Sequence, residues 1–599
     1  MSFLVDVIVP GPWWNQLTYR CEENLSAGSR VRVPLGRGTR IAFVSHFPSE
    51  ESTSPPTIRK ISEVLDISPV FPASLWDLSN WIGETFLCGQ GTALGDMLPP
   101  DVLKGATYDA LCFEKMSGGV SRTTDSVVFT PRDEDRFEEY RRMIRRTNGA
   151  CLVLFPEGAT ARRFYASLDG KDDVLLWPNG GGRRAMQAWD SARRSIPRVV
   201  LGAPGVCYAP LPRIDLVIIE DESASSYDSQ KFPFLNYRMI AARRARDHGA
   251  QLVLGGRMPS ARAFQRYRPP CPERPGSRLV LIRKNAALHK ATLGIDKDLP
   301  VGRAIVRMTE RMLRESQVSL WILDRLGYAV GIRCDDCGAA IACTRCGGAL
   351  RWKERDAVAT CMQCRLNVAV PERCPSCGGV LLIGERPGTE ALHNIAARCS
   401  GNPQVVECVA EDFSVVSRRK AIEKRVSDGA ILIGTRGILP FCDTLSVGLV
   451  CWIDPEVELG FSRYYGAVLL FSMIWESCWR GPGAEKRKVL VQTSETGTKW
   501  IRGARQGWSA FWDEELRERK LMMLPPYQMH YEIEAPPVVR SSILESLRHA
   551  NIDVIPWSEE NERALVVGVG LRTMKKAMER FFSIKASGLG FPRIRVRME

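Results

Sequence analysis

The sequence predicts a multidomain α/β protein in which a cysteine-rich module interrupts the second of two α/β lobes. Its 599 residues exceed the size at which one core stops growing, so several domains are expected. Two regions alternate short apolar runs with helical patterns, which is typical of buried parallel strands joined by helices. Within the second region, cysteines occur in four closely spaced pairs, which indicates an inserted metal-binding module.

The parallel strands are expected at eight apolar runs. In the first lobe, 128–275, the runs are ACLVLF (150–155), RVVLGAP (198–204), DLVIIED (215–221) and QLVLGG (251–256). In the second lobe, 276–333 and 382–500, they are QVVECV (404–409), AILIGT (430–435), GLVCWID (448–454) and KVLVQT (488–493).

The segments that flank the lobes have other patterns. Residues 1–100 begin with short strands and turn signals and continue with a helix near 72–86, which predicts a small β-rich unit. Residues 101–127 are polar and aperiodic and are expected to form a linker. In 501–599 the order from Tyr531 is strand, helix, strand, strand, helix, strand, as in a ferredoxin-like α+β domain.

The composition is that of a globular protein, with 45% hydrophobic and 25% charged residues. The net charge of +14 favours a polyanionic partner such as nucleic acid, although a mildly basic globular protein is the alternative. The amino terminus lacks the basic start of a secretory signal, and the longest apolar run, 467–475, is too short to span a membrane. A cytoplasmic location without membrane contact is therefore expected.

The cysteine module at 334–381 predicts two structural zinc ions. Its CxxC pairs are Cys334 and Cys337, Cys343 and Cys346, Cys361 and Cys364, and Cys374 and Cys377. Each pair presents two sulfurs at the separation that a tetrahedral ion requires, so two pairs complete one site. The glycines behind the pairs fit tight turns, namely Gly338, Gly347, Gly348, Gly378 and Gly379. A reducing compartment disfavours the alternative of disulfides, and the fourfold repetition disfavours thioredoxin-like redox pairs.

Several segments resemble the primosomal protein N′ (PriA) family of replication-restart DNA helicases. These segments are DRLGYAVGIRC (324–334), RPGTEAL (386–392), ILIGT (431–435), ERKLMMLPPY (518–527) and SRVRVPLGRG (29–38). The resemblance covers most of the chain and implies two RecA-like helicase lobes behind a domain that grips a DNA 3′ end. It also implies that the outer pairs, Cys334, Cys337, Cys374 and Cys377, share one zinc. The inner pairs, Cys343, Cys346, Cys361 and Cys364, would then share the other.

The resemblance assigns Tyr19, Gly36 and Arg59 to the DNA-binding pocket of the 3′-end domain, although the first and last could also be ordinary barrel residues. Leu17 and Thr18 stand where the family has an aromatic residue and an acid. A carboxylate that could accept the hydrogen bond of a 3′-hydroxyl is thus missing. Binding to duplex or forked DNA is expected to survive with weaker 3′-end selectivity. The short linker replaces the winged-helix domain of the family.

The phosphate-binding motif of the family is absent from the sequence. Its expected position, Phe129 to Phe137, has no GxxxxGK[ST] string and carries three acids, Asp133, Glu134 and Asp135, which would repel a triphosphate. The Walker B segment is partly retained as Glu220, Asp221 and Glu222, with Ser223 in place of a histidine.

Three further motifs that couple ATP to DNA are degenerate. Gly255 to Met258 replaces a Gly-Ser-Ala-Thr element, and Pro440 and Phe441 replace a Lys-Gly step in motif V. In the arginine-finger segment, Trp479 and Pro482 occupy the finger positions, while Arg480 lies one residue out of register. Loss of an arginine finger alone costs about 10³ to 10⁵ in rate.

These features predict a PriA-like DNA-binding protein of replication restart and primosome assembly without ATPase or helicase activity. No catalytic residue, ATP or Mg²⁺ is expected. The expected partners are branched or forked DNA and primosome or helicase-loading proteins, bound by a monomer. Two alternatives stay open: an active ATP-dependent 3′–5′ DNA helicase with aberrant motifs, and a zinc-stabilised protein-interaction scaffold.

Overall fold

The computed structural model describes the chain from residue 3 to residue 599 with several gaps. Outside the described part lie residues 1–2, 47–57, 110–124, 284–300, 324–328, 335, 346, 353–356, 362–365, 381, 385–388, 400–402, 410–411, 414, 427, 457–463, 495–496, 558–562 and 584–589. The chain divides into two compact units. The first comprises Met1–Phe129, Glu134–Pro269 and Glu518–Glu599, and the second comprises Thr130–Asp133 and Pro270–Arg517. Most of the predicted linker falls on 110–124 and lies outside the described residues.

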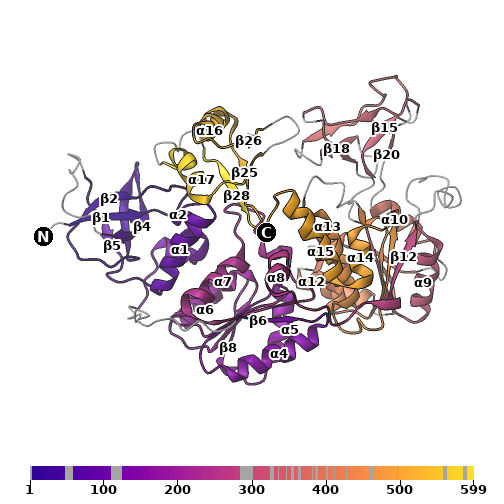
Figure 1. Cartoon of the computed structure of the whole chain (residues 1–599), viewed down its shortest axis with the longest axis horizontal. Helices are drawn as coiled ribbons and strands as arrows, with labels where there is room; N and C mark the ends of the chain where they lie inside the picture. Colours follow the sequence, from indigo (N-terminus) through magenta and orange to yellow (C-terminus); the bar gives the residue numbers. More distant parts are fainter. Residues whose placement is uncertain are drawn as a thin grey trace. The chain divides into compact units, whose positions relative to one another are not determined.

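The first unit begins with a five-stranded antiparallel sheet in the order β2-β1-β4-β3-β5 (Figure 1). Its strands are β1 (Phe3–Ile8), β2 (Leu17–Cys21), β3 (Arg30–Leu35), β4 (Gly38–His46) and β5 (Glu63–Val64). Apolar side chains on every second residue, among them Val5, Val7, Val31 and Val33, form its core because strand side chains alternate between two faces. The helices α1 (Ala73–Thr85), α2 (Gln90–Met97) and α3 (Pro100–Lys104) follow. The predicted β-rich N-terminal region is thus confirmed.

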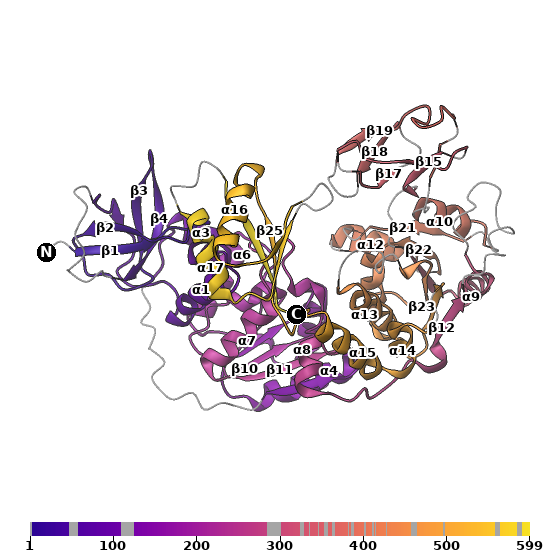
Figure 2. The same cartoon turned by 45° about the horizontal axis from the view of Figure 1, so that its top comes forward.

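A six-stranded parallel sheet forms the first α/β lobe, in the order β6-β11-β10-β7-β9-β8. Its strands are β6 (Ser126–Phe129), β7 (Cys151–Leu154), β8 (Val174–Leu176), β9 (Val199–Gly202), β10 (Leu216–Ile219) and β11 (Gln251–Gly256). The connecting helices are α4 (Asp133–Arg146), α5 (Gly158–Ala166), α6 (Arg183–Arg193), α7 (Tyr237–His248) and α8 (Ala261–Tyr267). Helices α6 and α7 cover one face and α4 and α5 the other (Figures 1 and 2).

The two faces of this sheet explain its uninterrupted apolar strands. In β10, Val217 and Ile219 pack into the core with α6 and α7, whereas Leu216 and Ile218 pack into the core with α4 and α5. All four residues of the strand are buried, as expected for a parallel strand covered on both sides. The next residue along the chain is Glu220, so the end of a fully apolar strand delivers the acidic segment.

The second unit contains another six-stranded parallel sheet, in the order β12-β24-β23-β13-β22-β21. Its strands are β12 (Leu279–Arg283), β13 (Val318–Ile322), β21 (Val405–Glu407), β22 (Ile431–Gly434), β23 (Val447–Trp452) and β24 (Lys488–Thr493). Its helices are α9 (Arg303–Arg314), α10 (Thr389–Ala396), α12 (Val416–Arg425), α13 (Gly466–Trp479), α14 (Lys499–Gln506) and α15 (Trp508–Leu521), the last of which crosses into the first unit. The two predicted α/β sheets are therefore present.

The cysteine module is a pair of small sheets between β13 and α10. One sheet has the order β14-β17-β18-β19 and the other β16-β15-β20. The strands are β14 (Ala329–Val330), β15 (Ile332–Cys334), β16 (Ala340–Ile341), β17 (Leu350–Trp352), β18 (Val358–Cys361), β19 (Asn367–Ala369) and β20 (Leu382–Gly384). Its apolar core is small, with Ile332, Leu350 and Trp352 at the centre, so additional cross-links are needed to hold so small a module.

The last segment of the first unit has the element order strand, helix, strand, strand, helix, strand. The elements are β25 (His530–Glu534), α16 (Pro537–His549), β26 (Val554–Ile555), β27 (Ala564–Val567), α17 (Leu571–Met578) and β28 (Arg593–Arg597). The sheet order is β26-β27-β25-β28, and neighbouring strands are antiparallel. In the described part of the chain, no helix combines the length and the apolar character that a bilayer crossing requires.

Candidate functional site

The connection between β6 and α4 lies at the position of the missing phosphate-binding loop. Strand β6 ends at Phe129 and α4 begins at Asp133, so residues 130–132 connect them, and none of the three is a glycine. Glu134 and Asp135 are exposed in the first turn of α4. The positive end of the helix dipole stabilises acidic side chains in the first turn of a helix. Nucleotide-binding loops use this same end of a helix to bind phosphate. The chain thus places its own negative charge where a phosphate would need to bind.

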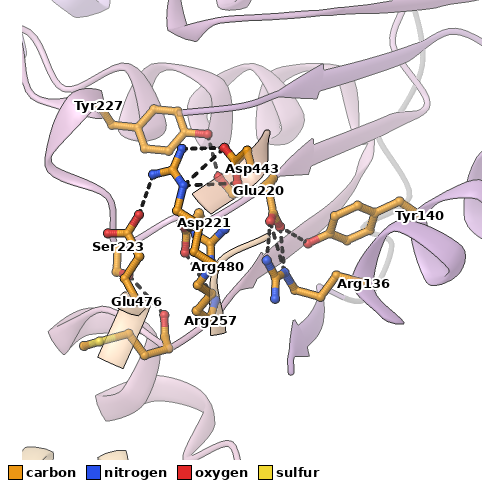
Figure 3. A network of polar contacts seen from close by, with 11 residues as sticks. Arg136, Tyr140, Glu220, Asp221, Ser223, Tyr227, Arg257, Asp443, Glu476 and Arg480 are labelled. Atoms are coloured by element: carbon orange, nitrogen blue, oxygen red, sulfur yellow. Dashed lines mark hydrogen bonds and ion pairs between the residues drawn. The ribbon is translucent and has the colours of Figure 1, made fainter. Parts of the chain in front are cut away.

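Glu220, the first acid of the Walker B segment, is 1% exposed and belongs to a buried ion pair (Figure 3). Arg136 on α4 donates to its Oε1 from Nη2 at 2.7 Å and from Nε at 3.0 Å. The hydroxyl of Tyr140, one helical turn further along α4, donates to Oε2 at 2.7 Å. Burial and the Glu220 carboxylate raise the pKa of Tyr140 well above its usual value, so this hydroxyl stays protonated and donates. The Tyr227 hydroxyl also donates to the backbone carbonyl of Glu220, at 2.7 Å.

The glycines at the end of β11 are required by this network. A Cβ atom on Gly255 would lie 1.7 Å from the hydroxyl oxygen of Tyr140. Gly256 has φ +155°, and a Cβ there would lie 3.0 Å from the Cα of Asp221. Any larger residue at position 255 would therefore displace Tyr140 from Glu220. The contacts of Tyr140 and Asp221 with these glycines thus explain why the Gly-Gly-Arg-Met element begins with two residues that lack side chains.

The other two acids of the segment are also bound to arginines of the same unit. Asp221 accepts a hydrogen bond from Nη1 of Arg257 and another from the backbone N–H of Arg257 at 3.2 Å. Glu222, which is 2% exposed, accepts from Nη1 of Arg238 at 2.5 Å. The backbone N–H of Ser260 donates to the second oxygen of Glu222 at 2.6 Å. Each carboxylate therefore has a guanidinium partner, and Arg238 is shared between Glu222 and Glu599.

This arrangement neutralises the acids that an ATPase would offer to Mg²⁺. A divalent cation binds through carboxylate oxygens, and a guanidinium within hydrogen-bonding distance of each carboxylate would repel it. Removal of one partner from a buried ion pair leaves an unpaired charge and is strongly destabilising. Where the chain is described, metal-ligand side chains converge at the outer cysteines, and these three acids form no such group. The acids are therefore integral parts of the lobe's packing.

Arg480 of the arginine-finger segment is held within the second unit. It follows the last residue of α13 and is 4% exposed. Its Nη2 donates to Asp443 at 2.8 Å and its Nη1 donates to Glu476 at 2.5 Å (Figure 3). The guanidinium of Arg278 lies 4.3 Å from the ring centre of the buried Trp479. Two carboxylates thus fix the arginine nearest to the expected finger position.

The predicted DNA-binding residues of the N-terminal domain differ in burial, since Tyr19 is buried whereas Gly36 and Arg59 are exposed. Tyr19 in β2 is 5% exposed and donates to the carbonyl of Pro34 at 3.0 Å. Burial raises its pKa, and the nearby Arg59 partly offsets that rise. Gly36 has φ +61° in the turn between β3 and β4, and a Cβ atom added there would have no neighbour within 4 Å. Tyr19 is thus a core residue whose hydroxyl supports the strand before that turn.

A carboxylate lies beside the position where the sequence lacks one. Thr18 and Asp6 are directly opposite each other in the β1–β2 ladder. The Thr18 hydroxyl donates to Oδ1 of Asp6 at 2.6 Å, and the pair is exposed to solvent. Strand pairing therefore brings an acid next to Thr18 that lies 12 residues away in the sequence.

The outer cysteines, Cys334, Cys337, Cys374 and Cys377, form one cluster, with all four sulfurs within 4.8 Å of one another. The sulfurs of Cys334 and Cys377 are 3.5 Å apart, and those of Cys337 and Cys374 are 3.7 Å apart. Four ligands at a zinc–sulfur distance of about 2.3 Å would be about 3.8 Å apart in a tetrahedron. The spacing therefore fits a zinc ion and is too long for disulfides.

The turns of the cysteine pairs share one geometry. The N–H of Gly338 donates to the carbonyl of Cys334 at 3.0 Å, and the N–H of Gly378 donates to that of Cys374 at 2.8 Å. Both glycines have a positive φ, +74° and +76°, which a residue with a side chain disfavours. The backbone N–H of Ser376 donates to the sulfur of Cys374, and this bond has the largest effect of several hydrogen bonds that lower the pKa of that thiol to about 7, whereas hydrogen bonds with neighbouring cysteines raise the pKa of Cys377.

The inner cysteines are only partly described. Cys343 and Cys361 are buried, whereas Cys346 and Cys364 lie outside the described residues. Gly347 repeats the turn geometry, with φ +70° and an N–H that donates to the carbonyl of Cys343 at 2.9 Å. The second zinc site therefore stays a prediction.

Sequence reasoning did not assign a role to the arginines that bind the acids or to Asp6. Arg136 lies inside the string that replaces the P-loop, and Arg257 stands at the alanine of the Gly-Ser-Ala-Thr element that Gly255 to Met258 replaces. The basic residues at positions 136 and 257 could have indicated that the Walker B acids are neutralised by arginines. No local pattern points to Arg238 or Asp6, because their partners are set by helix packing and strand register.

Comparison with known proteins gives one family model and many relatives. A model described as a 3′ DNA-binding domain matches residues 6–99. Replication restart protein PriA of Treponema pallidum is 24% identical over 586 residues, which cover 88% of this chain and 86% of that protein. The protein of the same name from Haemophilus influenzae is 21% identical over 86% of this chain and 85% of its own length. The match to that of Bacillus subtilis, at 23% identity, covers 63% of this chain but only 48% of the relative.

The comparison with solved structures gives distant matches. Dbp5 of S. cerevisiae bound to RNA and ADP BeF3 is 13% identical, with a TM-score of 0.36 over 67% of this chain and 90% of its own. The Hef helicase domain of Pyrococcus furiosus is 8% identical, with a TM-score of 0.29 over 64% of this chain and 94% of its own. Both TM-scores lie below 0.5, so neither structure supports a functional conclusion for this chain.

Proposed function

We propose that this chain, a divergent member of the PriA family of replication restart proteins, binds branched DNA and assembles restart proteins on it without hydrolysing ATP. The family supplies the premise of a role in replication restart, and the 3′ DNA-binding model at residues 6–99 supports binding to DNA. The proposed partners beyond DNA are primosome or helicase-loading proteins. Two zinc ions, one at the outer cysteines, would stabilise the surface that receives them.

One observation carries the proposal that ATP is not used: each acid of the Walker B segment is bound to an arginine of its own unit. The pairs are Glu220 with Arg136, Asp221 with Arg257, and Glu222 with Arg238. Mg²⁺ and its nucleotide would have to separate buried ion pairs at a considerable cost in free energy. The short β6–α4 connection also lacks the glycines that cradle phosphates. Nucleotide binding would thus be opposed at both the phosphate and the metal positions.

The ion pairs of Arg480 support the same proposal. An arginine finger stabilises the charge that develops on the transferred phosphoryl group. Arg480 instead donates to Asp443 and Glu476 and is almost fully buried. To act as a finger, it would have to leave two carboxylates and expose their charge. A fixed structural role therefore fits this arginine better than a catalytic one.

We further propose that Asp6 replaces the acid missing at Thr18 and lets the N-terminal domain keep its contact with a DNA 3′-hydroxyl. The Asp6 carboxylate accepts the Thr18 hydroxyl at 2.6 Å on an exposed face of the sheet. A carboxylate is the acceptor that a 3′-hydroxyl donor requires. Arg59, also exposed, would then bind phosphate.

The C-terminal segment is proposed to be ferredoxin-like, supported by its element order and its antiparallel sheet.

The central experiment titrates the purified chain with a fluorescent ATP analogue and Mg²⁺, with and without forked DNA. No saturable nucleotide binding is expected, while anisotropy of labelled DNA is expected to show tighter binding to forks than to plain duplex. Binding to DNA should weaken with salt, because phosphate contacts release counterions. Arg59→Ala should weaken it, with the exposed Arg40→Ala as the matched control in the same domain.

Three outcomes separate the competing functions. DNA-stimulated ATP turnover that is lost on Glu220→Gln would establish an active helicase and refute the proposal. Equal affinity for forks and duplex would refute fork recognition. An absence of DNA binding at every salt concentration would leave a zinc-stabilised protein scaffold as the remaining function.

A further inference from the structure

The last residue of α15 and the turn that follows it expose three large apolar side chains in a row. Leu521, Met522 and Met523 are 78%, 67% and 54% exposed. Single exposed apolar residues are ordinary on protein surfaces, but contiguous ones mark interaction sites. Within the described chain no other run of three such residues occurs. These three residues, here called the apolar tip, therefore require a functional explanation.

Backbone and side-chain hydrogen bonds of the neighbouring residues hold the apolar tip in place. The N–H of Met522 donates to the carbonyl of Glu518 at 2.9 Å, and the N–H of Leu524 donates to that of Arg519 at 2.8 Å. Arg519, which is 3% exposed, also donates from Nη1 to the carbonyl of Pro525 at 3.0 Å. The tip is thus a preformed projection whose shape does not depend on a partner.

One further contact and one backbone angle show that the fold imposes this shape. His530 in β25, 5% exposed, donates from Nε2 to the carbonyl of Met523 at 3.1 Å. Met523 itself has φ +52°, a left-handed conformation that residues with long side chains disfavour. Strained backbone of this kind persists where the surrounding structure fixes it, and it is concentrated at binding sites. The fold therefore maintains a destabilising backbone conformation at a turn whose apolar side chains are exposed to water.

The chemistry of the tip fits a stack of nucleic-acid bases. Leucine, methionine and proline are side chains that proteins insert between base steps. Methionine sulfur is polarisable and makes favourable contacts with aromatic rings. The exposed Lys520 lies directly beside the tip, where it can contact a phosphate, and the chain as a whole carries a net charge of +14. A partner that combines aromatic faces with negative charge therefore complements the tip better than an apolar protein surface does.

We propose that residues 521–523 form a wedge that inserts between bases at the branch point of forked DNA and unstacks them without ATP. This inference rests on the proposed DNA binding and adds how the fork is distinguished from plain duplex. Unstacking is least costly where pairing already ends, so a rigid wedge selects branch points. The free energy of wedge and phosphate contacts drives the local opening, and no nucleotide is needed for it.

The test uses the full chain and a fork that carries 2-aminopurine beside the branch point. Anisotropy of the labelled fork measures binding, and 2-aminopurine fluorescence measures unstacking. The wedge variant is Leu521→Ser/Met522→Ser. The matched control is Val538→Ser/Ile555→Ser, which alters two other exposed apolar residues of the C-terminal segment, 62% and 56% exposed. Because the altered side chains are exposed, both variants are expected to melt at the wild-type temperature.

The wild-type chain is expected to raise the fluorescence of the fork but not that of a duplex with the same base in its middle. In the wedge variant, the fluorescence rise should be at least about fivefold smaller than in the wild type. Its fork affinity should fall by less than about tenfold, which is equivalent to about 1.4 kcal/mol. The control variant should match the wild type in both signals.

Each contrary result has a distinct meaning. Fork binding without a fluorescence rise, or a rise that the wedge variant keeps, would overturn the wedge and leave the proposed function intact. No anisotropy change with any DNA would overturn the proposed function together with the wedge. Normal DNA signals combined with loss of a protein partner in the wedge variant would overturn the wedge in favour of a protein-docking tip.

Discussion

Removal of Arg136 is expected to destabilise the first lobe more than removal of almost any surface charge. In Arg136→Met, Glu220 loses its guanidinium while both side chains of the pair are essentially inaccessible, at 0% and 1% exposure. Breaking a buried pair by removing one partner costs about 3 to 5 kcal/mol. Tyr140 keeps one hydrogen bond to the carboxylate, so a loss near the lower end, about 3 kcal/mol, is expected.

The matched control is Arg141→Met on the same helix. Arg141 pairs with Glu138, which is 60% exposed, and exposed pairs of this kind contribute less than about 1 kcal/mol. The double variant Arg136→Met/Glu220→Met removes the unpaired charge and should recover most of the loss, because apolar replacements of buried pairs are well tolerated. The three variants together separate lost charge pairing from lost packing.

Hydrogen exchange of peptides from α4 and β10 is the appropriate assay, because a chain with several units does not unfold in one step. Protection of these peptides should fall in Arg136→Met and stay near the wild-type level in the control. Equal protection in Arg136→Met and Arg141→Met would refute the structural role of the pair. The result expected of an ATPase is different: Glu220→Gln would abolish turnover and leave protection unchanged.

Three other predictions concern zinc, DNA ends and pH. Zinc content by atomic absorption should fall from two ions to one in Cys334→Ser, since one outer ligand is lost. Asp6→Asn should reduce the preference for a 3′-hydroxyl over a 3′-phosphate end about tenfold, measured by competition. Burial and nearby arginines lower the pKa of His248 from 6.5 to about 3, so the folded state loses stability as pH falls below 6.5. His248→Gln should remove about 1 kcal/mol of the loss between pH 7 and 5.5.

The apolar runs predicted the four inner strands of the first parallel sheet, but in the second sheet they included the edge strand β21 and missed the central strand β13. Strands such as β10 are buried on both faces and read as continuous apolar runs. The edge strands β8 and β12 were not predicted; both are short and only partly buried. The CxxC spacing was equally informative, because two residues between cysteines fix the position of both sulfurs locally. Long-range pairing left no comparable local signal.

The sequence by itself determined that the phosphate-binding loop is missing, that the Walker B acids remain, and that the cysteines come in pairs. Only the tertiary structure decided what the acids do, because Arg136 and Glu220 are 84 residues apart and meet through the packing of α4 on β10. Whether a buried carboxylate binds a cation or a guanidinium depends on which side chain the fold places within about 3 Å. That distance is a property of packed elements, and no motif records it.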